Sequence, residues 1–570
     1  MRKSISILTV LLLICLISMP AMAKVKINIV VVDAPGVGFN DPTPAAPLAT
    51  NPGTTIGEQR LIAFTFAANV WGSTLDSAAP INIQASFAPL ACTATTATLG
   101  SAGTIQVVLD FPGAEFPGTL YHTALANKLA LQDLIPGDPA TNADDIRARF
   151  NGNLGNAGCL TGTFWYYGLD TNHTASQINL VTVLLHEFSH GLGFSTFTSG
   201  VTGNFLAGFP AVWDRYIYDT SISKSWFDMT AAERRASAIN PRRVAWSGAQ
   251  VTDAVPGVLA PGVPGLSIAS PASVAGHYEV GTASFGAALT AAGVTGEIVV
   301  ATDASNASGA STTDACTAIT NPSAVAGKIA LVDRGTCGFV VKAANAQAAG
   351  AIALLVADNL AGGPPAGLGG ADPTITIPAV RITLADGNTI KAALASGTVT
   401  GTLLLDMSRL AGTDGQNHAL LYTPNPFISG SSVSHYDQQE FPNQLMEPNI
   451  NTDLTLNVKP PQDLTLPLLR DIGWYPDEDT DGVPDATDQC AGSDLTAGDI
   501  SIQGCNTTVQ NVLFTTGCTI RDLIKNAGTG VKNHGGFVSN MAHLGDALVN
   551  AGIISPIQKD ALQSCSARAK

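Results

Sequence analysis

The first third of the chain alternates between strand-like and helix-like hydrophobic patterns. Runs of β-branched or alternating apolar residues predict strands, and apolar residues repeating every three or four positions predict a helix with one buried side. The strand-like segments are residues 26–32, 81–87, 104–109 and 163–169, and the helix-like segments are residues 57–75 and 121–134. This order predicts an α/β or α+β domain whose sheet leads into a further helix at residues 180–194.

A second hydrophobic pattern, rich in Ala and Gly, occupies residues 271–405. We expect short strands at 297–301, 328–332, 352–356 and 376–382, and helices at 339–349 and 384–394. The Pro- and Gly-rich stretch 255–271 before it is typical of a linker. Because the chain is too long for one hydrophobic core, we expect several domains. They are a domain split between residues 24–255 and 406–475, an α/β unit inserted at 271–405, an acidic loop at 477–490 and a small helical region at 505–570.

The N-terminus has the three parts of an export signal. Arg2 and Lys3 supply positive charge, residues 5–17 are apolar, and Ala21-Met22-Ala23 offers small residues for cleavage. We therefore expect residues 1–23 to be a signal peptide, and the mature protein to be secreted or to reach the periplasm or cell surface. The apolar stretch is shorter than a membrane span and no later run is longer, so stable membrane insertion after cleavage is not expected.

The cysteines agree with export, because disulfides form in oxidising compartments. Cys15 lies in the signal peptide, and eight cysteines remain after it. Pairing neighbours along the chain is our working hypothesis, although the sequence does not fix the connectivity. It predicts the bridges 92–159, 316–337, 490–505 and 518–565.

Charge and composition limit the partners. The formal net charge is −16 at pH 7, and Lys and Arg form no cluster along the chain. Nucleic acid and anionic membrane surfaces are therefore excluded as expected partners. The sequence does not indicate an oligomeric state.

The predicted helix at 180–194 contains His186-Glu187-Phe188-Ser189-His190. Residues four apart lie on one face of a helix, so both imidazoles can reach one metal ion. Glu187 points to the adjoining side, where it can act as general base on metal-activated water. We expect His186 and His190 to bind a catalytic zinc ion and Glu187 to move protons. The alternative is a core helix with two hydrogen-bonded histidines.

A catalytic zinc ion needs a third protein ligand and an open fourth position. Gly193 follows the second histidine at the spacing of metzincin proteases, but Thr196 occupies the position of their third histidine. We expect His435 to replace it. The rival is a gluzincin arrangement in which Glu440 or Glu447 is the ligand, but Pro442 and Pro448 disfavour the helix on which that glutamate usually lies.

His435 lies in Ser431-Ser-Val-Ser-His-Tyr436, which is followed by Phe441-Pro-Asn-Gln-Leu-Met-Glu-Pro448. Together with the helix motif, these segments resemble leishmanolysin-type metzincins, in which an insertion separates the glycine from the third histidine. The resemblance implies a metzincin-like fold with a twisted sheet and an active-site helix. It also implies that Met446 forms the Met-turn beneath the metal site.

The segment inserted before His435 has its own resemblance. Residues 327–339, 342–356 and 377–382 are similar to protease-associated (PA) domains, which accompany secreted proteases. The resemblance implies a lid or a substrate-recruiting surface. A passive insertion is equally consistent with the sequence, because surface loops tolerate inserted domains.

The acidic loop 477–490 places carboxylates at alternate positions before a glycine, a spacing that wraps oxygen ligands around Ca²⁺. It resembles a thrombospondin type 3 repeat, including the closing Cys490. The expected ligands of a structural calcium ion are Asp477, Asp479, Asp481, the Val483 carbonyl, Asp485 and Asp488.

These features together predict a secreted zinc endopeptidase that hydrolyses peptide bonds in protein or peptide substrates. An alternative is a non-catalytic secreted or cell-surface protein that binds partners through the PA domain and calcium loop. A hydrolase acting on non-peptide amides is a third possibility.

Overall fold

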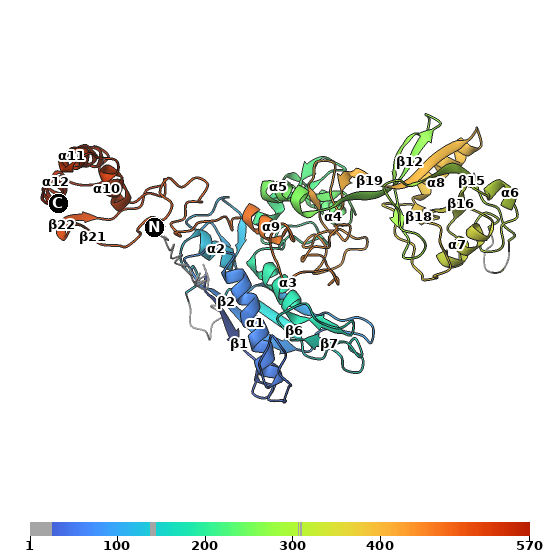
Figure 1. Ribbon diagram of the computed structural model, residues 1–570, viewed down its shortest axis with the longest axis horizontal. Coiled ribbons are helices and arrows are strands. Elements are labelled where there is room, and N and C mark those ends of the chain that lie inside the picture. The colour runs from blue at the N-terminus through green and yellow to red at the C-terminus, as the bar shows by residue number, and fades with distance from the viewer. Residues whose placement is uncertain (1–24, 137–143, 306, 308–310, 570) are drawn as a thin grey trace, which may run out of the picture.

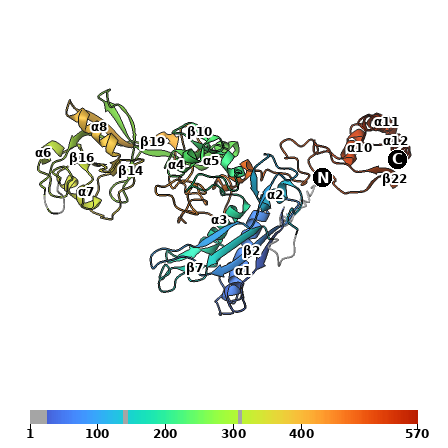
Figure 2. The same ribbon diagram turned by 180° about the vertical axis from the view of Figure 1, so that it is seen from behind.

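The computed structural model describes residues 25–136, 144–305, 307 and 311–569. The signal peptide expected at residues 1–23 lies outside this part. The chain forms three units in an extended arrangement (Figure 1, Figure 2). A central domain, made of residues 25–260 and 411–475, lies between an inserted domain of residues 261–410 and a C-terminal module of residues 499–569. Within the described ranges, no helix is both long and apolar enough to cross a membrane.

A four-stranded sheet organises the N-terminal half of the central domain, in the order β1-β2-β6-β3. Three strands are parallel, and β3 is the antiparallel edge strand beside β6. Helices α1 and α3 pack together, and the Trp71 indole donates to the Leu185 carbonyl at 3.3 Å. The strands are β1 (Ile27–Val31), β2 (Ile81–Ala88), β3 (Gly100–Thr104) and β6 (Ile146–Asn151), and the helices are α1 (Ile56–Gly72) and α3 (Leu180–Leu192).

Helix α3 lies close to the sheet because Gly191 has no side chain. A Cβ atom on Gly191 would lie 2.4 Å from the Ile146 side chain in β6. The helix ends at Gly193, where φ is +133°, a conformation that favours glycine. Small pairs of strands and a short helix complete this half: β4 (Val107–Leu109), β5 (Leu120–His122), β7 (Phe164–Tyr166), β8 (Gln177–Asn179) and α2 (Thr123–Leu129).

The second half of the central domain joins segments from both sides of the insertion. Its sheet has the order β10-β9-β11-β20, so β20, which follows the insertion, pairs with β11, which precedes it. One hydrophobic core extends from Val25 to Trp474 and includes both segments. The elements are β9 (Ile217–Asp219), β10 (Lys224–Ser225), β11 (Val244–Trp246), β20 (Ala419–Leu420), α4 (Ala231–Ser237), α5 (Ala249–Val258) and α9 (Thr465–Asp471).

The inserted domain is an eight-stranded mixed sheet with the order β13-β12-β19-β15-β16-β17-β18-β14. Alternate residues of the central strands face opposite cores: Ile390 of α8 lies with Ile329 and Leu331, whereas Ala343 of α7 lies with Ala330. The strands are β12 (Pro261–Ser270), β13 (Gly276–Glu279), β14 (Gly281–Thr282), β15 (Val294–Val300), β16 (Ile329–Asp333), β17 (Ala353–Ala357), β18 (Ala379–Ile382) and β19 (Val399–Leu410). The helices are α6 (Pro322–Val325), α7 (Phe339–Ala348) and α8 (Leu384–Leu394).

The C-terminal module combines a hairpin with three helices around its own core. The region expected to be helical, residues 505–570, therefore begins with a strand and is helical only from Ile520 onward. The elements are β21 (Asp499–Ile502), β22 (Cys505–Gln510), α10 (Ile520–Gly528), α11 (His534–Asn550) and α12 (Pro556–Arg568).

Four sequence predictions need correction. The expected linker at 255–271 is wrong, because the chain there ends α5 and forms β12, which pairs along β19. The helix expected at 121–134 begins as strand β5 and ends at Leu129. The strand expected at 104–109 is divided between β3 and β4. Two of the four predicted disulfides are also wrong. The bridges 92–159 and 316–337 are as predicted, but the structure has 490–518 and 505–565 in place of 490–505 and 518–565.

Candidate functional site

The structure brings the three predicted histidines together. His186 and His190 come from α3, and His435 comes from a segment 249 positions after His186. Their ligating atoms lie within 4.8 Å of one another. The Nε2 atom of His186 lies 3.2 Å from the Nε2 atoms of both His190 and His435. All three side chains are buried.

Each ring is fixed by a backbone carbonyl. The Nδ1 atoms of His186, His190 and His435 lie 2.7, 2.8 and 2.8 Å from the carbonyl oxygens of Leu445, Phe194 and Ser431. A carbonyl only accepts, so each Nδ1 carries the hydrogen and each Nε2 presents a lone pair. Burial lowers the pKa of His186 to about 4 and that of His190 to about 3, and lowers the pKa of His435 well below its usual value. The imidazoles are therefore neutral at pH 7.

This donor set fits a zinc ion. Three lone pairs that face one another repel unless a cation lies between them. Zinc–imidazole bonds of about 2.0–2.1 Å in tetrahedral geometry separate neighbouring nitrogens by roughly 3.3 Å. The observed separation of 3.2 Å is close to that value. A carbonyl on the second ring nitrogen is the usual partner of a metal-ligating histidine.

The turn that contains Met446 holds the His186 ring and the backbone next to His435. The Leu445 carbonyl accepts from His186, and the Met446 carbonyl accepts from the amide of Tyr436, the residue after His435, at 2.9 Å. The Asp463 carboxylate accepts from the Leu445 amide at 2.7 Å. Met446 is completely buried.

The rival glutamates do not join the histidines. Glu447 accepts from the Gln444 amide at 2.8 Å and from the Asn451 side chain at 2.9 Å. Both carboxylate oxygens of Glu440 are buried without a hydrogen-bond partner among the described residues. Burial, with the negative charge of Glu447 adding to it, raises the pKa of Glu440 well above its usual value. Neither glutamate belongs to the group that could hold a metal ion.

Glu187 lies beside the edge strand β3. A Cβ atom on Gly100 would lie 2.6 Å from the Glu187 Oε1 atom, so the glycine leaves room for the carboxylate. Burial raises the pKa of Glu187 to about 8, although a hydrogen bond from the Ala102 backbone opposes this shift. A cation at the neighbouring imidazoles would favour the ionised carboxylate.

A cleft of about 800 Å³ opens over the three histidines and Glu187. Its lining includes residues 97–102, which contain the start of β3, residues 195–196, 198–201 and 448–450, and part of the segment 427–435. Among the described residues that line it, Glu187 is the only acidic side chain and none is Lys or Arg. Apart from Glu187, the cleft therefore presents an uncharged, hydroxyl-rich surface around the histidines.

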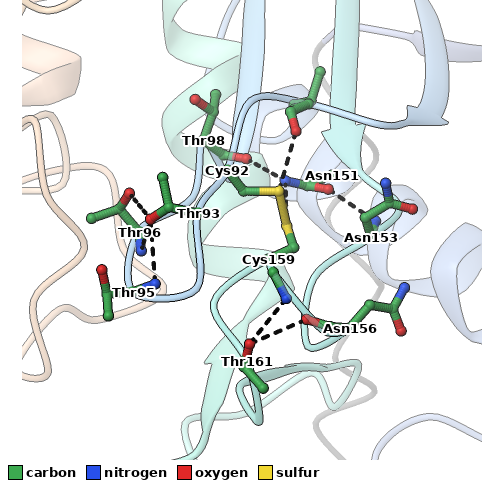
Figure 3. Close-up of a disulfide and its surroundings, with 12 residues drawn as sticks. Cys92, Thr93, Thr95, Thr96, Thr98, Asn151, Asn153, Asn156, Cys159 and Thr161 are labelled. Atoms are coloured by element: carbon green, nitrogen blue, oxygen red, sulfur yellow. Dashed lines mark hydrogen bonds between the residues drawn. A yellow bond between two sulfur atoms is a disulfide. The ribbon is translucent and has the colours of Figure 1, made fainter.

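A disulfide anchors the loop that precedes residues 97–102 of the cleft lining (Figure 3). Cys92, before β3, is bonded to Cys159, after β6. Between them, the Asn151 side chain donates to the Thr98 carbonyl at 2.9 Å, and the Asn151 amide donates to the Leu99 carbonyl at 2.9 Å. Two hydrogen bonds thus tie the cleft edge to the end of β6, and the disulfide joins the loop before that edge to the loop after β6.

Sequence reasoning missed several supporting residues. Asp214 accepts from the hydroxyls of Thr196 and Thr198, each at 2.5 Å, so the residue at the usual third-histidine position has a structural partner. Asp463 and Gly100 also escaped notice. The available signals were local and weak: Asp463 accepts from the amide two residues later, at Thr465, as turn-forming aspartates do.

The acidic loop forms a second cluster. The carboxylates of Asp477, Asp479 and Asp481 lie within 4.8 Å of one another. Burial raises the pKa of Asp481 to about 6, with Asp479 and Asp488 adding to the shift, and its Oδ2 atom has no partner within the described structure. Asp485 instead accepts from the Glu478 amide at 2.8 Å. The Val483 amide donates to Asp481 at 2.7 Å.

Comparison with known proteins identifies the inserted domain. The family model of the PA domain matches residues 294–390. Residues 294–390 form a PA domain. The match lies within the region 271–405 in which the sequence resembles that family, although the sheet around it extends from Pro261 to Leu410.

Curated relatives match only short parts of the chain. The chain is 38% identical over 86 residues to the minor extracellular protease Vpr of Bacillus subtilis (strain 168), covering 15% of this chain and 10% of that protein. It is 39% identical over 93 residues to the probable leucine aminopeptidase 2 of Aspergillus fumigatus, covering 16% and 19%. It is 36% identical over 142 residues to vacuolar-sorting receptor 2 of Arabidopsis thaliana, covering 23% and 22%. The chain thus spans between a tenth and about a fifth of these relatives.

These similarities say nothing about the three-histidine site as a whole, so its interpretation rests on its geometry. An overlap of 142 residues cannot contain both His186 and His435, which are 249 positions apart. A solved zinc aminopeptidase from Bacillus subtilis is 23% identical over 27% of this chain and 35% of its own, with a TM-score of 0.18. An aminopeptidase from Aneurinibacillus sp. strain AM-1 is 20% identical over 34% and 42%, with a TM-score of 0.20. Likeness at these values carries no argument about function.

Proposed function

We propose that this chain is an exported zinc-dependent endopeptidase of the metzincin type. The observation that carries the proposal is the convergence of three Nε2 lone pairs beside a buried glutamate in a cleft. Three protein ligands leave a position open, as in catalytic zinc sites, whereas structural zinc sites are closed by four. The leishmanolysin-like order of His190, the insertion, His435 and the turn at Met446 supports the same family.

His186, His190 and His435 would hold the zinc ion. When bound, it would polarise the scissile carbonyl and make water a stronger acid. Glu187 accepts the proton of the attacking water and returns it to the leaving amine. The space beside Gly100 lets this carboxylate stand at the cleft. The three backbone carbonyls keep the rings in place through the cycle, because each Nδ1–H is already committed.

The edge strand β3 is the element on which we expect the substrate to lie. In the described sheet, β6 pairs with one side of β3 and no strand pairs with the other. An extended peptide can therefore add to this edge through main-chain hydrogen bonds, and pockets on alternate side chains provide specificity. The Cys92–Cys159 bridge, which anchors the preceding loop, would keep this edge rigid.

The lining of the cleft favours cleavage within a chain over removal of an N-terminal residue. An aminopeptidase must neutralise the free α-ammonium group of its substrate, which is charged near neutral pH. Glu187 is the only carboxylate lining the described cleft, and the proposed chemistry already uses it. An uncharged surface instead suits the uncharged peptide groups of an internal site.

A blocked peptide tests this function directly. We expect hydrolysis of an acetylated and amidated peptide that carries a fluorophore and a quencher, its loss with a zinc chelator and its return with added Zn²⁺. Leucine p-nitroanilide serves as the aminopeptidase substrate. Hydrolysis of only that compound would replace the endopeptidase proposal by an aminopeptidase, and hydrolysis of neither would favour a binding protein.

We also propose that Asp477, Asp479 and Asp481 hold a structural calcium ion, with Asp488 beside Asp481 as a further ligand. Clustered carboxylates with an unpartnered buried oxygen support this proposal. The loop lies where the central domain meets the C-terminal module, and the Cys490–Cys518 bridge follows it. The expected Val483 carbonyl and Asp485 ligands remain proposals. Export through residues 1–23 is supported by the four disulfides, which require an oxidising compartment.

A further inference from the structure

His122 and Ser195 form a hydrogen-bonded pair at the cleft, outside the three-histidine group. The His122 Nε2 atom lies 2.8 Å from the Ser195 hydroxyl oxygen. His122 is completely buried at the start of α2, whereas Ser195 is partly exposed and lines the cleft. Ser195 follows Phe194, whose carbonyl fixes His190. The pair therefore reaches the cleft next to a proposed zinc ligand.

The surroundings of the other ring nitrogen decide which way this hydrogen bond runs. The His122 Nδ1 atom is buried and has no hydrogen-bond partner among the described residues. The ring packs on Phe197, with 4.4 Å between the ring centres. A neutral imidazole carries one N–H, and a buried N–H without an acceptor is rarer in proteins than an acceptor without a donor. The hydrogen therefore belongs on Nε2, which donates to Ser195.

This direction frees the hydrogen of the serine hydroxyl. A hydroxyl has one donor and two acceptor positions, and His122 occupies an acceptor position of Ser195. The donor of Ser195 can then point into the cleft. By contrast, the hydroxyls of Thr196 and Thr198, which also line the cleft, are committed to Asp214.

The same geometry argues against a serine nucleophile. In that role, Nε2 would have to accept the serine proton, and a carboxylate or other acceptor would have to hold Nδ1–H. The described surroundings of Nδ1 offer no such group. The pair is arranged as a hydrogen-bond donor.

We propose that Ser195 donates a hydrogen bond to a carbonyl oxygen of the bound peptide, and that His122 is a positioning residue that fixes the Ser195 hydroxyl. The inference rests on the proposed peptidase function. A neutral donor that is already oriented costs no reorganisation when the substrate oxygen gains negative charge, so its removal slows the reaction. His122 acts only through Ser195.

Kinetics of single and double variants test this assignment. We expect Ser195→Ala to lower kcat/KM roughly 10- to 100-fold, with zinc content and Tm unchanged. His122→Phe should cause a similar loss, and His122→Gln should recover part of it, because its amide can donate from nearly the same place. His122→Phe should have little further effect in the Ser195→Ala background, since coupled residues are not additive. His418→Phe, which removes a histidine outside the cleft, is the matched control.

The result that overturns the proposal is a kcat/KM of Ser195→Ala within about twofold of the parent, or losses that add in the double variant. A loss in kcat would assign the hydrogen bond to the reacting carbonyl, and a rise in KM would assign it to a neighbouring peptide group. ¹⁵N-histidine NMR gives a readout that needs no activity: the His122 signal, identified by its absence in His122→Gln, should show hydrogen on Nε2. Hydrogen on Nδ1 would refute the pair even if the parent cleaves no peptide. An inactive parent with the Nε2–H form would count against the peptidase alone.

Discussion

The two clusters that could hold metal ions are built in different ways. The histidine cluster draws its ligands from two segments 249 positions apart, and carbonyls from three separate places orient the rings at a cleft. The aspartate cluster comes from one short stretch, and Asp477 lies 3.8 Å from the buried ammonium of Lys128. The described lining of the cleft includes no aspartate. A site assembled by the whole fold can orient a reaction, whereas a local loop can bind a cation and stiffen a junction.

The largest expected effect is a loss of kcat in a Glu187 variant that still binds zinc. Glu187→Gln should lower kcat roughly 10³-fold, because general acid–base groups contribute about 10²–10⁴, while zinc content remains that of the parent. Glu297→Gln in the PA domain is the matched control. Peptide cleavage and zinc stoichiometry are measured on the same preparations. Parent-like cleavage by Glu187→Gln would remove the proposed mechanism.

The next effect tests whether the distant ligand completes the site. His435→Ala should weaken zinc binding by at least on the order of 100-fold and abolish cleavage, because two imidazoles remain. Asp481→Asn should leave zinc binding intact. Metal analysis after dialysis distinguishes the variants. Full zinc retention by His435→Ala would mean that another residue supplies the third ligand.

Calcium should affect stability and leave the chemistry unchanged. Adding Ca²⁺ to the chelated protein at about 100 times its Kd should stabilise the folded state by about 2.7 kcal/mol. Thermal unfolding followed with and without Ca²⁺ should show a rise of several degrees in the parent and none in Asp481→Asn. An equal rise in both proteins would contradict the aspartate site.

The smallest effect concerns the space around the proposed base. Gly100→Ala should lower kcat by about tenfold, because its Cβ would lie 2.6 Å from the Glu187 carboxylate and displace it. Gly103→Ala on the same strand is the control, since a Cβ there meets nothing within 4 Å. Steady-state kinetics compare the two. Equal activities would show that Glu187 has freedom to adjust.

Much of the fold followed from local patterns. The predicted helix 384–394 coincides with α8, and the strand predicted at 81–87 corresponds to β2. Strand β2 alternates buried and half-buried residues along its whole length, and such periodicity makes an element's presence and type the most predictable property. Part of the site was also predictable from the helix motif, because two histidines four residues apart on α3 lie on the same face of the helix.

The predictions that failed concerned features that depend on contacts between distant segments. Residues 261–270 contain Pro and Gly, which are typical of linkers, yet they form β12 by pairing with β19, far along the chain. Leu120–His122 forms a strand through pairing with β4. Cys505 lies in β22 and Cys565 in α12, and the packing of these elements sets a bridge that spacing does not reveal. Local patterns likewise give no sign of Asp463 or of the His122–Ser195 pair.

The inserted domain, residues 261–410, leaves and rejoins the central domain at nearly one point. Strands β12 and β19 run antiparallel from the pair Pro261–Leu410 to the pair Ser270–Thr400, and the Ala411 amide donates to the Ala260 carbonyl at 3.0 Å. A short turn between Ala260 and Ala411 would close the chain if residues 261–410 were removed, because these two ends already lie side by side. The same pair of strands would allow one inserted module to be exchanged for another without moving the ends of the central domain.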